Sequence, residues 1–377
     1  MGQIKVKGKI LRRFCREYRF FVVILQLETM TLHVFNPEHD LALAANLSNF
    51  TSPHAGRQLR ADIGFLPAIW ADGDDVVLVD DVEAAQRDFA RVMHRRFDRF
   101  VDKRQLVRLG ITHVEPWGWD LALRSFLLRY GVGAVPTEEE IEVIRDLSHR
   151  KHAIDLLRAL DFEGTTGQSW LAEEMAAVQQ ALEAHQQIVV KAPWSSSGRG
   201  VRFIEGTVSM SGLERWIQHV IDRQGSVVIE TYCHKVKDFG MEFESDGEGH
   251  VRYLGLSLFH TQNGAYTGNI LATEEEKQEM ISRYISNNLL ISVREKICEV
   301  LGECYSHRYA GPLGVDMMVV RGNDNQHFLL NPCVEINLRR TMGHVALALS
   351  KQVPSDHVMR VECSENRYRL RVLASLR

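Results

Sequence analysis

Residues 188–203 combine one lysine with a loop of small polar residues, a pattern suited to binding phosphate. An apolar run at 188–190 leads into Lys191, and a second alternating run starts at Val201. The loop between them contains Ser195, Ser196, Ser197, Gly198, Arg199 and Gly200. Hydroxyl and backbone N–H groups donate to phosphate oxygens, and glycine lets the backbone approach an anion closely. The Gly-Lys-Ser/Thr ending of a Walker loop is absent. A β-hairpin with a Ser/Gly-rich turn explains the pattern equally well.

A second group of residues with chemical potential lies in the last third of the chain. Asp316 stands inside an apolar run, and Glu335 and Asn337 are separated by one residue. Residues two apart on a strand share a face. The runs 315–320 and 328–331 predict neighbouring antiparallel strands, so Asp316 could share that face. Two carboxylates and an amide oxygen suit the magnesium that accompanies nucleotide phosphates. Taken alone, Glu335 and Asn337 fit the solvated face of an edge strand better.

Polar residues also follow the first predicted strand, at 31–35. They are Asn36, Glu38, His39 and Asp40, and they stand where open α/β sheets bind ligands. Asp40 can instead cap a helix over 41–47. We favour this cap followed by a solvated loop.

The elements that position these groups change in type along the chain. Strands at 31–35 and 76–79 with a helix near 57–70 predict a parallel α/β domain. The charged stretch 82–109 is predicted to be helical, and Gly131, Gly133 and Pro136 indicate a domain junction. Thr137 and the three glutamates after it predict a capped helix start. Further helices are expected near 148–160, 172–185, 212–222, 271–301 and 341–350.

Composition excludes several classes of protein. The 377 residues are 45% hydrophobic and 25% charged, as in globular proteins. The net charge of −4 gives no argument for nucleic-acid binding. No apolar run approaches the roughly 18 residues that a membrane span needs. The cysteines form no CxxC pair and predict reduced thiols in a cytoplasmic protein: Cys15, Cys233, Cys298, Cys304, Cys333 and Cys363.

Residues 1–29 imitate a signal peptide, with a basic segment before the apolar run 20–27. The apolar run is short, and no small-residue cleavage site follows it. Met30 directly precedes a predicted strand, as a natural start would. We therefore expect a peripheral N-terminal extension; an added strand or a partner-binding arm is the alternative.

The order of these motifs resembles the ATP-grasp superfamily. A strand lysine with a Ser/Gly loop, a strand ending in Glu230, an apolar strand with Asp316 and then Glu-x-Asn follow one another over roughly 148–349. The resemblance implies an N-terminal parallel α/β domain, like the one that usually precedes this fold, and then a two-lobed ATP-grasp fold with antiparallel sheets. The implied units are an extension at 1–29, an α/β domain at 30–135, a first lobe with the lid at 136–230 and a second lobe with the metal site at 231–377.

The resemblance also implies roles for residues of this sequence. Lys191, Lys151 (or its neighbour Arg150) and the loop 195–200 would contact the phosphates of ATP. Asp238 would bind the ribose, with Glu242 as the competing choice, and the metal ligands would be Asp316, Glu335 and Asn337. Of Arg339 and Arg340, only one should enter the site, because neighbours on a strand point oppositely. The linker along the adenine would be Glu230, Thr231, Tyr232 and Cys233.

Most members of the ATP-grasp superfamily, which this chain resembles, activate a carboxylate with ATP. They use one or two Mg²⁺ ions, and Mn²⁺ can take the place of Mg²⁺. An amine or similar nucleophile then attacks the acyl phosphate. We expect such a ligase, acting on a small carboxylate and an amine, with a homodimer as the default assembly. A non-catalytic nucleotide-binding or regulatory protein and an ATP-dependent kinase on the same scaffold are the alternatives. His344 and the stretch 260–264 match no substrate motif.

Overall fold

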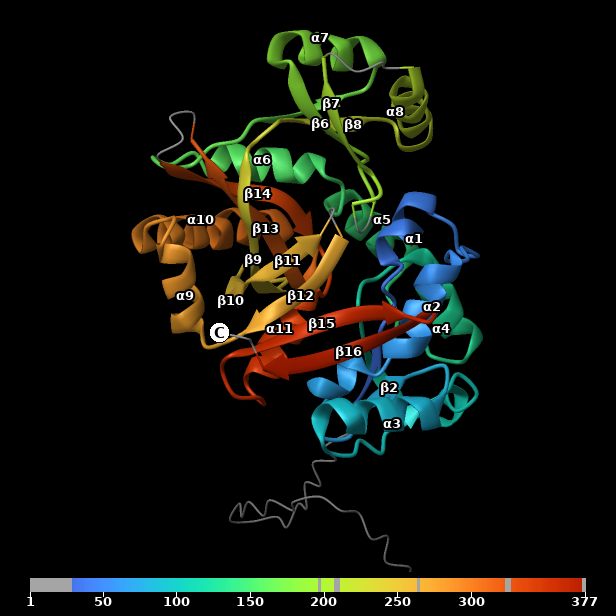
Figure 1. The fold of residues 1–377 in the computed structure, drawn as a ribbon. Helices are drawn as coiled ribbons and strands as arrows, with labels where there is room; N and C mark the ends of the chain where they lie inside the picture. The colour runs from blue at the N-terminus through green and yellow to red at the C-terminus, as the bar shows by residue number, and fades with distance from the viewer. Residues whose placement is uncertain (1–28, 196–197, 207–210, 263–264, 323–326, 375–377) are drawn as a thin grey trace, which may run out of the picture.

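The computed structural model describes residues 29–195, 198–206, 211–262, 265–322 and 327–374. The described elements form four sheets of four strands each, with helices packed around them (Figure 1). Nearly all of the predicted N-terminal extension, and Ser196 and Ser197 of the predicted lid, lie outside these ranges. No helix in the described part of the chain is long and apolar enough to cross a membrane.

The N-terminal sheet is parallel, as predicted. Its strand order is β3-β2-β1-β4, formed by β1 (Met30–Val34), β2 (Val76–Leu78), β3 (Phe100–Val101) and β4 (Ile111–Pro116). Its helices are α1 (His39–Ala45), α2 (His54–Ile63), α3 (Val82–Met93) and α4 (Leu121–Arg129), with 3-10 turns at Leu66–Ile69 and Leu106–Arg108. Its interior is made of apolar strand residues such as Leu32 and Val77, which are fully buried.

The predicted helix over 82–109 is wrong beyond Met93. His94 takes a left-handed φ of 52° and ends α3. Phe97 and Phe100 then pack on Phe89 of that helix, with ring centroids 5.9 and 6.0 Å away. Burying these rings outweighs the helical preference of the charged residues around them. The packing places Phe100 in β3 beside β2.

A small antiparallel sheet forms a lobe with its own core, at the top of Figure 1. It contains β5 (Ser169–Ala172), β6 (Gln187–Lys191), β7 (Val201–Glu205) and β8 (Val227–Thr231), in the order β5-β8-β6-β7. Helices α7 (Met175–His185) and α8 (Ser211–Gln224) cover it. Lys191 pairs with Val201 across the β6–β7 ladder, so the predicted strand, loop and returning strand are confirmed.

The largest core lies against a second antiparallel sheet. This sheet has the order β10-β9-β13-β14, from β9 (Lys235–Asp246), β10 (Val251–Ser257), β13 (Ala310–Arg321) and β14 (Phe328–Asn337). Three helices bury apolar faces in that core: α5 (Glu138–Leu147), α6 (Lys151–Ala159) and α10 (Asn287–Tyr305). The predicted antiparallel pairing of β13 with β14 is confirmed.

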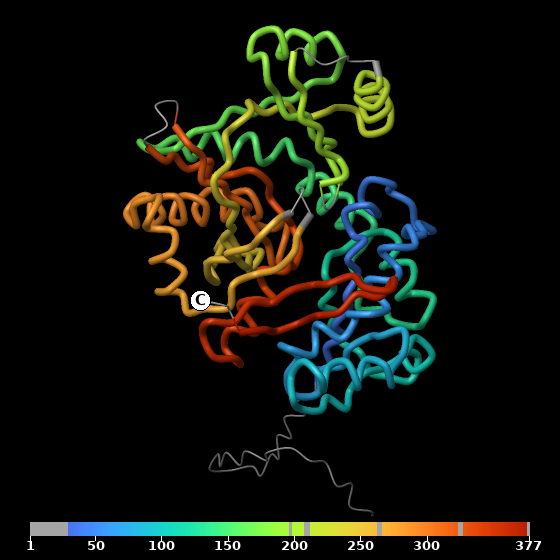
Figure 2. Tube along the Cα trace, viewed as in Figure 1, coloured from blue at the N-terminus to red at the C-terminus, as the bar shows by residue number. Residues whose placement is uncertain are grey.

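The sequence reading did not foresee the C-terminal hairpin of the fourth sheet. The strands are β11 (Phe259–Gln262), β12 (Ala265–Leu271), β15 (His357–Ser364) and β16 (Arg367–Ala374), accompanied by α9 (Glu274–Ser282) and α11 (Met342–Ser350). The hairpin β15–β16 runs back to the N-terminal domain (Figure 2). There the Tyr368 N–H donates to Asp62 Oδ2 of α2 at 2.8 Å. The hairpin therefore closes one side of the space between the N-terminal domain and the rest of the chain.

The N-terminus of α5 offers a stability test. Thr137 Oγ1 accepts from the Glu140 N–H at 3.2 Å, and Glu140 Oε2 accepts from the Thr137 N–H at 2.6 Å. Thr137→Ala is expected to lower the free energy of unfolding by about 1 kcal/mol, because it leaves a helix N–H without its cap. Urea unfolding measures this change. Thr51→Ala, at an exposed loop threonine, should change stability by less than about 0.5 kcal/mol. Equal effects would show that the capping box does not stabilise α5.

Candidate active site

The two halves of the predicted site meet although they are far apart in sequence. Lys191, at the end of β6, is buried, and its Nζ lies 2.6 Å from Glu230 Oε1 on the neighbouring strand β8. The same ammonium donates to the Val334 carbonyl at 3.1 Å. Val334 precedes Glu335 on β14, so the small lobe places its lysine directly beside the predicted metal strand.

A second cation connects the two lobes. Arg150 is buried at the start of α6; its guanidinium donates to Ser195 Oγ at 2.9 Å and to Glu335 Oε1 at 2.5 Å. The side chain of Lys151, the residue predicted for this place, lies elsewhere: its Nζ contacts Asp146 Oδ1 at 2.5 Å. Lys151 begins α6, and its side chain turns back to α5, so Arg150 is the basic residue in the site.

Acidic residues form a row across one face of the sheet. Asp316 on β13 pairs directly with Glu335 on β14 and with Gly240 on β9, and Glu242 lies two residues beyond Gly240. Burial, and then the neighbouring carboxylates of Glu335 and Glu242, raise the pKa of Asp316 to about 8. The predicted common face of Asp316, Glu335 and Asn337 is therefore confirmed, and its negative charge is not fully compensated.

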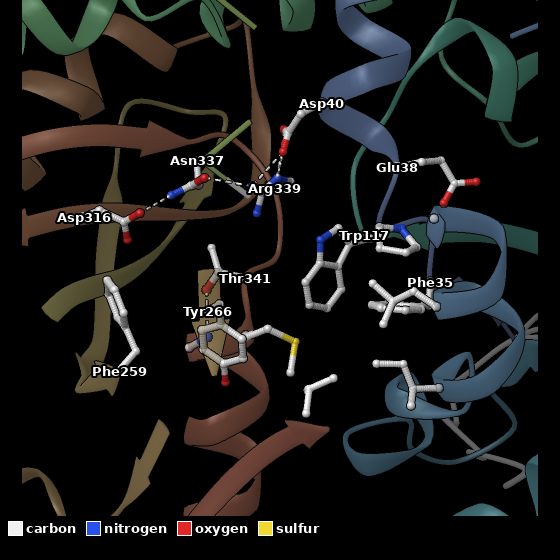
Figure 3. Close-up of a pocket in the computed structure, with 18 of the residues that line it drawn as sticks. Phe35, Glu38, Asp40, Trp117, Phe259, Tyr266, Asp316, Asn337, Arg339 and Thr341 are labelled. Atoms are coloured by element: carbon white, nitrogen blue, oxygen red, sulfur yellow. Dashed lines mark hydrogen bonds and ion pairs between the residues drawn. The ribbon is translucent and has the colours of Figure 1, made fainter. Parts of the chain in front are cut away.

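Asn337 and Arg339 continue this row toward the N-terminal domain. Asn337 Nδ2 donates to Asp316 Oδ2 at 3.0 Å, and Arg339 Nη2 donates to Asn337 Oδ1 at 2.9 Å. Arg339 also donates to both oxygens of Asp40, with Nη2 to Oδ2 at 2.8 Å and Nε to Oδ1 at 3.0 Å (Figure 3). Burial opposes the charge of each partner, but their contact lowers the pKa of Asp40 and raises that of Arg339.

The two tandem arginines point in different directions, although both lie beyond the end of β14 and not on a strand as expected. Arg340 donates to Glu115 Oε2 at 2.7 Å and lies over the Trp70 ring, 4.9 Å from its centroid. Both of these residues belong to the N-terminal domain. Arg339 lines the cavity and Arg340 does not.

The donor set fits a hard divalent cation. Within the described residues, His, Cys, Asp and Glu form no group of three close enough to hold a metal, so the third ligand would have to be an amide. Asp316 and Glu335 supply adjoining carboxylates whose mutual repulsion a cation would relieve. Asn337 now turns its Nδ2 toward Asp316; presenting its oxygen there would require the amide to turn over and release Arg339 Nη2.

The described part of the predicted lid lies at the edge of this site. Ser195, Gly198 and Arg199 line the cavity. Gly198 has a φ of +70°, which favours glycine. A Cβ built on Gly200 would lie 2.3 Å from Ser195 Oγ, so only glycine fits there. The described part of the loop thus brings hydrogen-bond donors to the edge of the cavity.

The predicted adenine linker connects the small lobe to β9. Glu230 and Thr231 end β8, and Glu230 is the partner of Lys191. Tyr232 is 40% exposed, and its ring packs edge-on against Phe203 with centroids 6.2 Å apart. Cys233 follows it and is partly buried. Asp238, predicted for ribose, is held by Lys235 Nζ at 2.7 Å and Thr261 Oγ1 at 2.8 Å.

A cavity of about 560 Å³ lies between the acidic row, the N-terminal domain and the C-terminal hairpin. Sequence reasoning left its N-terminal wall out of the site. Asp40 was expected to cap α1, but the N-cap position is Glu38, and Asp40 instead holds Arg339. The polar cluster after the first strand was the available signal. The following residues from that domain line the cavity: Phe35, Glu38, Asp40, Leu59, Ile63 and Trp117.

His149 beside this site predicts a pH dependence of stability. Its Nδ1 accepts from the Lys151 N–H at 2.9 Å, and burial, with Lys151 adding to the effect, lowers its pKa to about 4. Between pH 6.5 and about 4 the unfolded chain binds a proton that the folded chain does not. Lowering the pH through this range should therefore lower the free energy of unfolding, by up to about 1.4 kcal/mol per pH unit. His149→Asn should lessen this fall, and His219→Asn, at an exposed histidine, should not. Urea titrations at three pH values measure it, and unchanged slopes for His149→Asn would contradict the account.

Comparisons with known proteins concern the fold. No protein-family model and no curated protein sequence matches the chain. Biotin carboxylase from Campylobacter jejuni, solved as a complex with β,γ-ATP, matches with a TM-score of 0.51 and 11% identity, over 90% of this chain and 77% of that one. N5-carboxyaminoimidazole synthetase from Staphylococcus aureus, complexed with ADP, gives 0.49 and 12%, over 90% and 83%. A protein of Archaeoglobus fulgidus assigned to the ATP-grasp superfamily gives 0.48 and 12%, over 92% and 99%. The chain therefore has an ATP-grasp fold preceded by a parallel α/β domain.

Proposed function

We propose that the protein is an ATP- and magnesium-dependent ligase that activates a carboxylate as an acyl phosphate and passes it to an amine. The observation that supports this most is the meeting of Lys191 and Arg150 with the strand that carries Glu335. Phosphoryl transfer requires that spreading negative charge be positioned and neutralised, and it needs no protein nucleophile. A protein that only bound nucleotide would have no use for the row of carboxylates beside these cations.

ATP would lie between the small lobe and the β13–β14 ladder. Lys191 and Arg150 would contact its phosphates, with Ser195, Gly198 and Arg199 of the turn closing over them. The adenine would follow the linker from Glu230 to Cys233. Asp238 would face the ribose.

Magnesium would be held by Asp316, Glu335 and Asn337, and Mn²⁺ has the same ligand preference. When bound, the ion supplies positive charge to the phosphate oxygens. Arg339 is the candidate for the substrate carboxylate: it lines the cavity, and its guanidinium binds both oxygens of Asp40, whose place a substrate carboxylate would take.

The proposed reaction has two steps. A substrate carboxylate oxygen attacks the γ-phosphorus, the bond to the bridging oxygen breaks, and ADP leaves. The amine nitrogen then attacks the carbonyl carbon of the acyl phosphate, inorganic phosphate leaves, and the nitrogen loses a proton. Closure of the turn over the phosphates would keep water from the acyl phosphate.

The predicted units divide this work. We propose that 30–135 shapes the acceptor side, 136–230 closes over the phosphates and 231–377 holds the metal. The experiment is ADP release from magnesium-ATP in the presence of paired carboxylates and amines, with the amide product measured by mass spectrometry. ADP released together with an equal amount of amide supports the ligase. A phosphorylated product that persists in the presence of every amine would support the kinase instead.

A further inference from the structure

We infer that the cavity between the acidic row and the N-terminal domain binds the acceptor substrate, and that this acceptor is a primary amine on an apolar body. The inference rests on the proposed ligase function and adds the chemical class of the acceptor. It follows from two properties of the cavity wall.

The first property is a large apolar surface on one side. Phe35 and Trp117 pack edge to face, with ring centroids 4.8 Å apart, and Figure 3 shows them across the cavity from Tyr266. Further apolar side chains line the same side: Leu59, Ile63, Met342 and Val361. Contact with such a wall is favourable for a hydrocarbon or aromatic group and contributes little for a small polar acceptor.

The second property is a buried carboxylate without a cation. Glu242 lines the cavity, is 3% exposed, and its Oε2 has no hydrogen-bond partner among the described residues. Its neighbour His344 has Nδ1 at 3.0 Å, but that nitrogen accepts from the Thr341 N–H, and Nε2 lies 3.3 Å from the Phe243 carbonyl. In the neutral ring that these contacts describe, Nδ1 has no proton to donate to Glu242. A buried carboxylate without a donor is costly. A ligand ammonium would satisfy it, and would pass one proton to Glu242 before its nitrogen attacks.

The fold makes space for this carboxylate. A Cβ built on Gly343 would lie 1.8 Å from Glu242 Oε1, and one on Gly314 would lie 2.7 Å from Oε2. Both positions face Glu242 from packed elements, α11 and β13. Two larger residues there would exclude the carboxylate, so the glycines indicate a built position for Glu242.

The other polar groups described on this wall are engaged with one another. Tyr266 donates its hydroxyl to Asn269 Oδ1 at 2.5 Å, and Asn269 Nδ2 donates to Ser257 Oγ at 2.8 Å. The cations near the other carboxylates are engaged as well. Arg339 is held by Asp40, Arg150 by Glu335 and Arg60 by Glu38.

Glu242 is also badly placed to serve the nucleotide. Asp238 lies on the same face of β9, four residues closer to the linker, which corresponds to about 13 Å along a strand. Of the two residues predicted for the ribose, Asp238 is therefore the better placed. Glu242 is left facing the cavity below the acidic row.

The test is calorimetric binding of three small probes to the full chain without nucleotide. Phenylethylamine has both features, phenylethanol lacks the ammonium, and ethanolamine lacks the apolar body. Phenylethylamine should bind about tenfold more tightly than either of the others, as a charged hydrogen bond or a buried ring each contributes at least that much. Phenylethanol or ethanolamine binding as tightly as phenylethylamine, or no binding of phenylethylamine, overturns the inference.

Two matched variants locate the site. Glu242→Gln should reduce the preference for phenylethylamine over phenylethanol to less than about threefold, with the melting temperature confirming the fold; an unchanged preference contradicts the assignment. Val361→Thr should weaken phenylethylamine several-fold, whereas Val82→Thr, in the same apolar cluster but away from the cavity, should not. Amine binding without any ADP release would instead count against the ligase function alone.

Discussion

Glu335→Gln is expected to lower magnesium-dependent ATP turnover by at least about 100-fold. The substitution keeps the size of the side chain but removes one of two adjoining carboxylates proposed to hold the metal, and losing one preorganised electrostatic contact typically costs that much. It also replaces the charged acceptor of Arg150 Nη2, 2.5 Å away, with a neutral amide oxygen. The measurement is ADP release under saturating magnesium-ATP, alongside a melting curve.

A control for this variant is available on the same sheet. Glu244 on β9 accepts from Arg252 Nη2 at the same 2.5 Å, but it does not line the cavity. Glu244→Gln should retain turnover within about twofold, since exposed ion pairs contribute little. Turnover by Glu335→Gln at the rate of the unchanged chain would mean that the metal lies elsewhere.

Arg339→Lys is expected to lower kcat/KM for the carboxylate substrate by about 30- to 100-fold. Arg339 contacts Asp40 and Asn337 at once through a planar fork, and an ammonium cannot reproduce both contacts with the same geometry. Because the carboxylate and not ATP is proposed to meet this residue, the KM for ATP should change much less. Steady-state kinetics with each substrate varied in turn separates the two effects.

Arg340→Lys provides the matched comparison for Arg339→Lys. The side chain of Arg340 is 17% exposed against 16% for Arg339, and each makes a short contact with a carboxylate of the N-terminal domain. Arg340 faces Glu115 and Trp70 outside the cavity, so its variant should lose stability without a selective loss for the carboxylate. Equal losses from both variants would indicate a structural role for each.

The local parts of the site could be predicted from sequence because short-range rules determine them. The spacing of Glu335 and Asn337 fixes a common face on any strand, and the apolar runs around Asp316 specify its partner strand. The β6–β7 hairpin around Lys191 follows in the same way. These features require only the two-residue period of a strand and pairing between segments that are close in sequence.

The remaining parts depend on contacts between distant segments. Asp40 looks like a helix cap until Arg339, 299 residues later, reaches it. Nothing near Lys151 shows that its side chain turns to Asp146 while Arg150 reaches Glu335. Glu242 becomes a buried carboxylate only when β9 packs against α11, whose His344 Nδ1 lies 3.0 Å from Glu242 Oε2. The apolar wall requires three segments, the N-terminal domain, α11 and the C-terminal hairpin, and the hairpin was not foreseen.

The most direct test of the proposed ligase is the stoichiometry of ADP and amide. The full chain is incubated with magnesium-ATP, a panel of small carboxylates and an apolar primary amine, and both products are quantified over time. The account predicts that some carboxylate yields ADP and amide in equal amounts, and that withholding magnesium or introducing Glu335→Gln stops both. ADP release that no carboxylate or amine alters, or amide formation without magnesium, would contradict it.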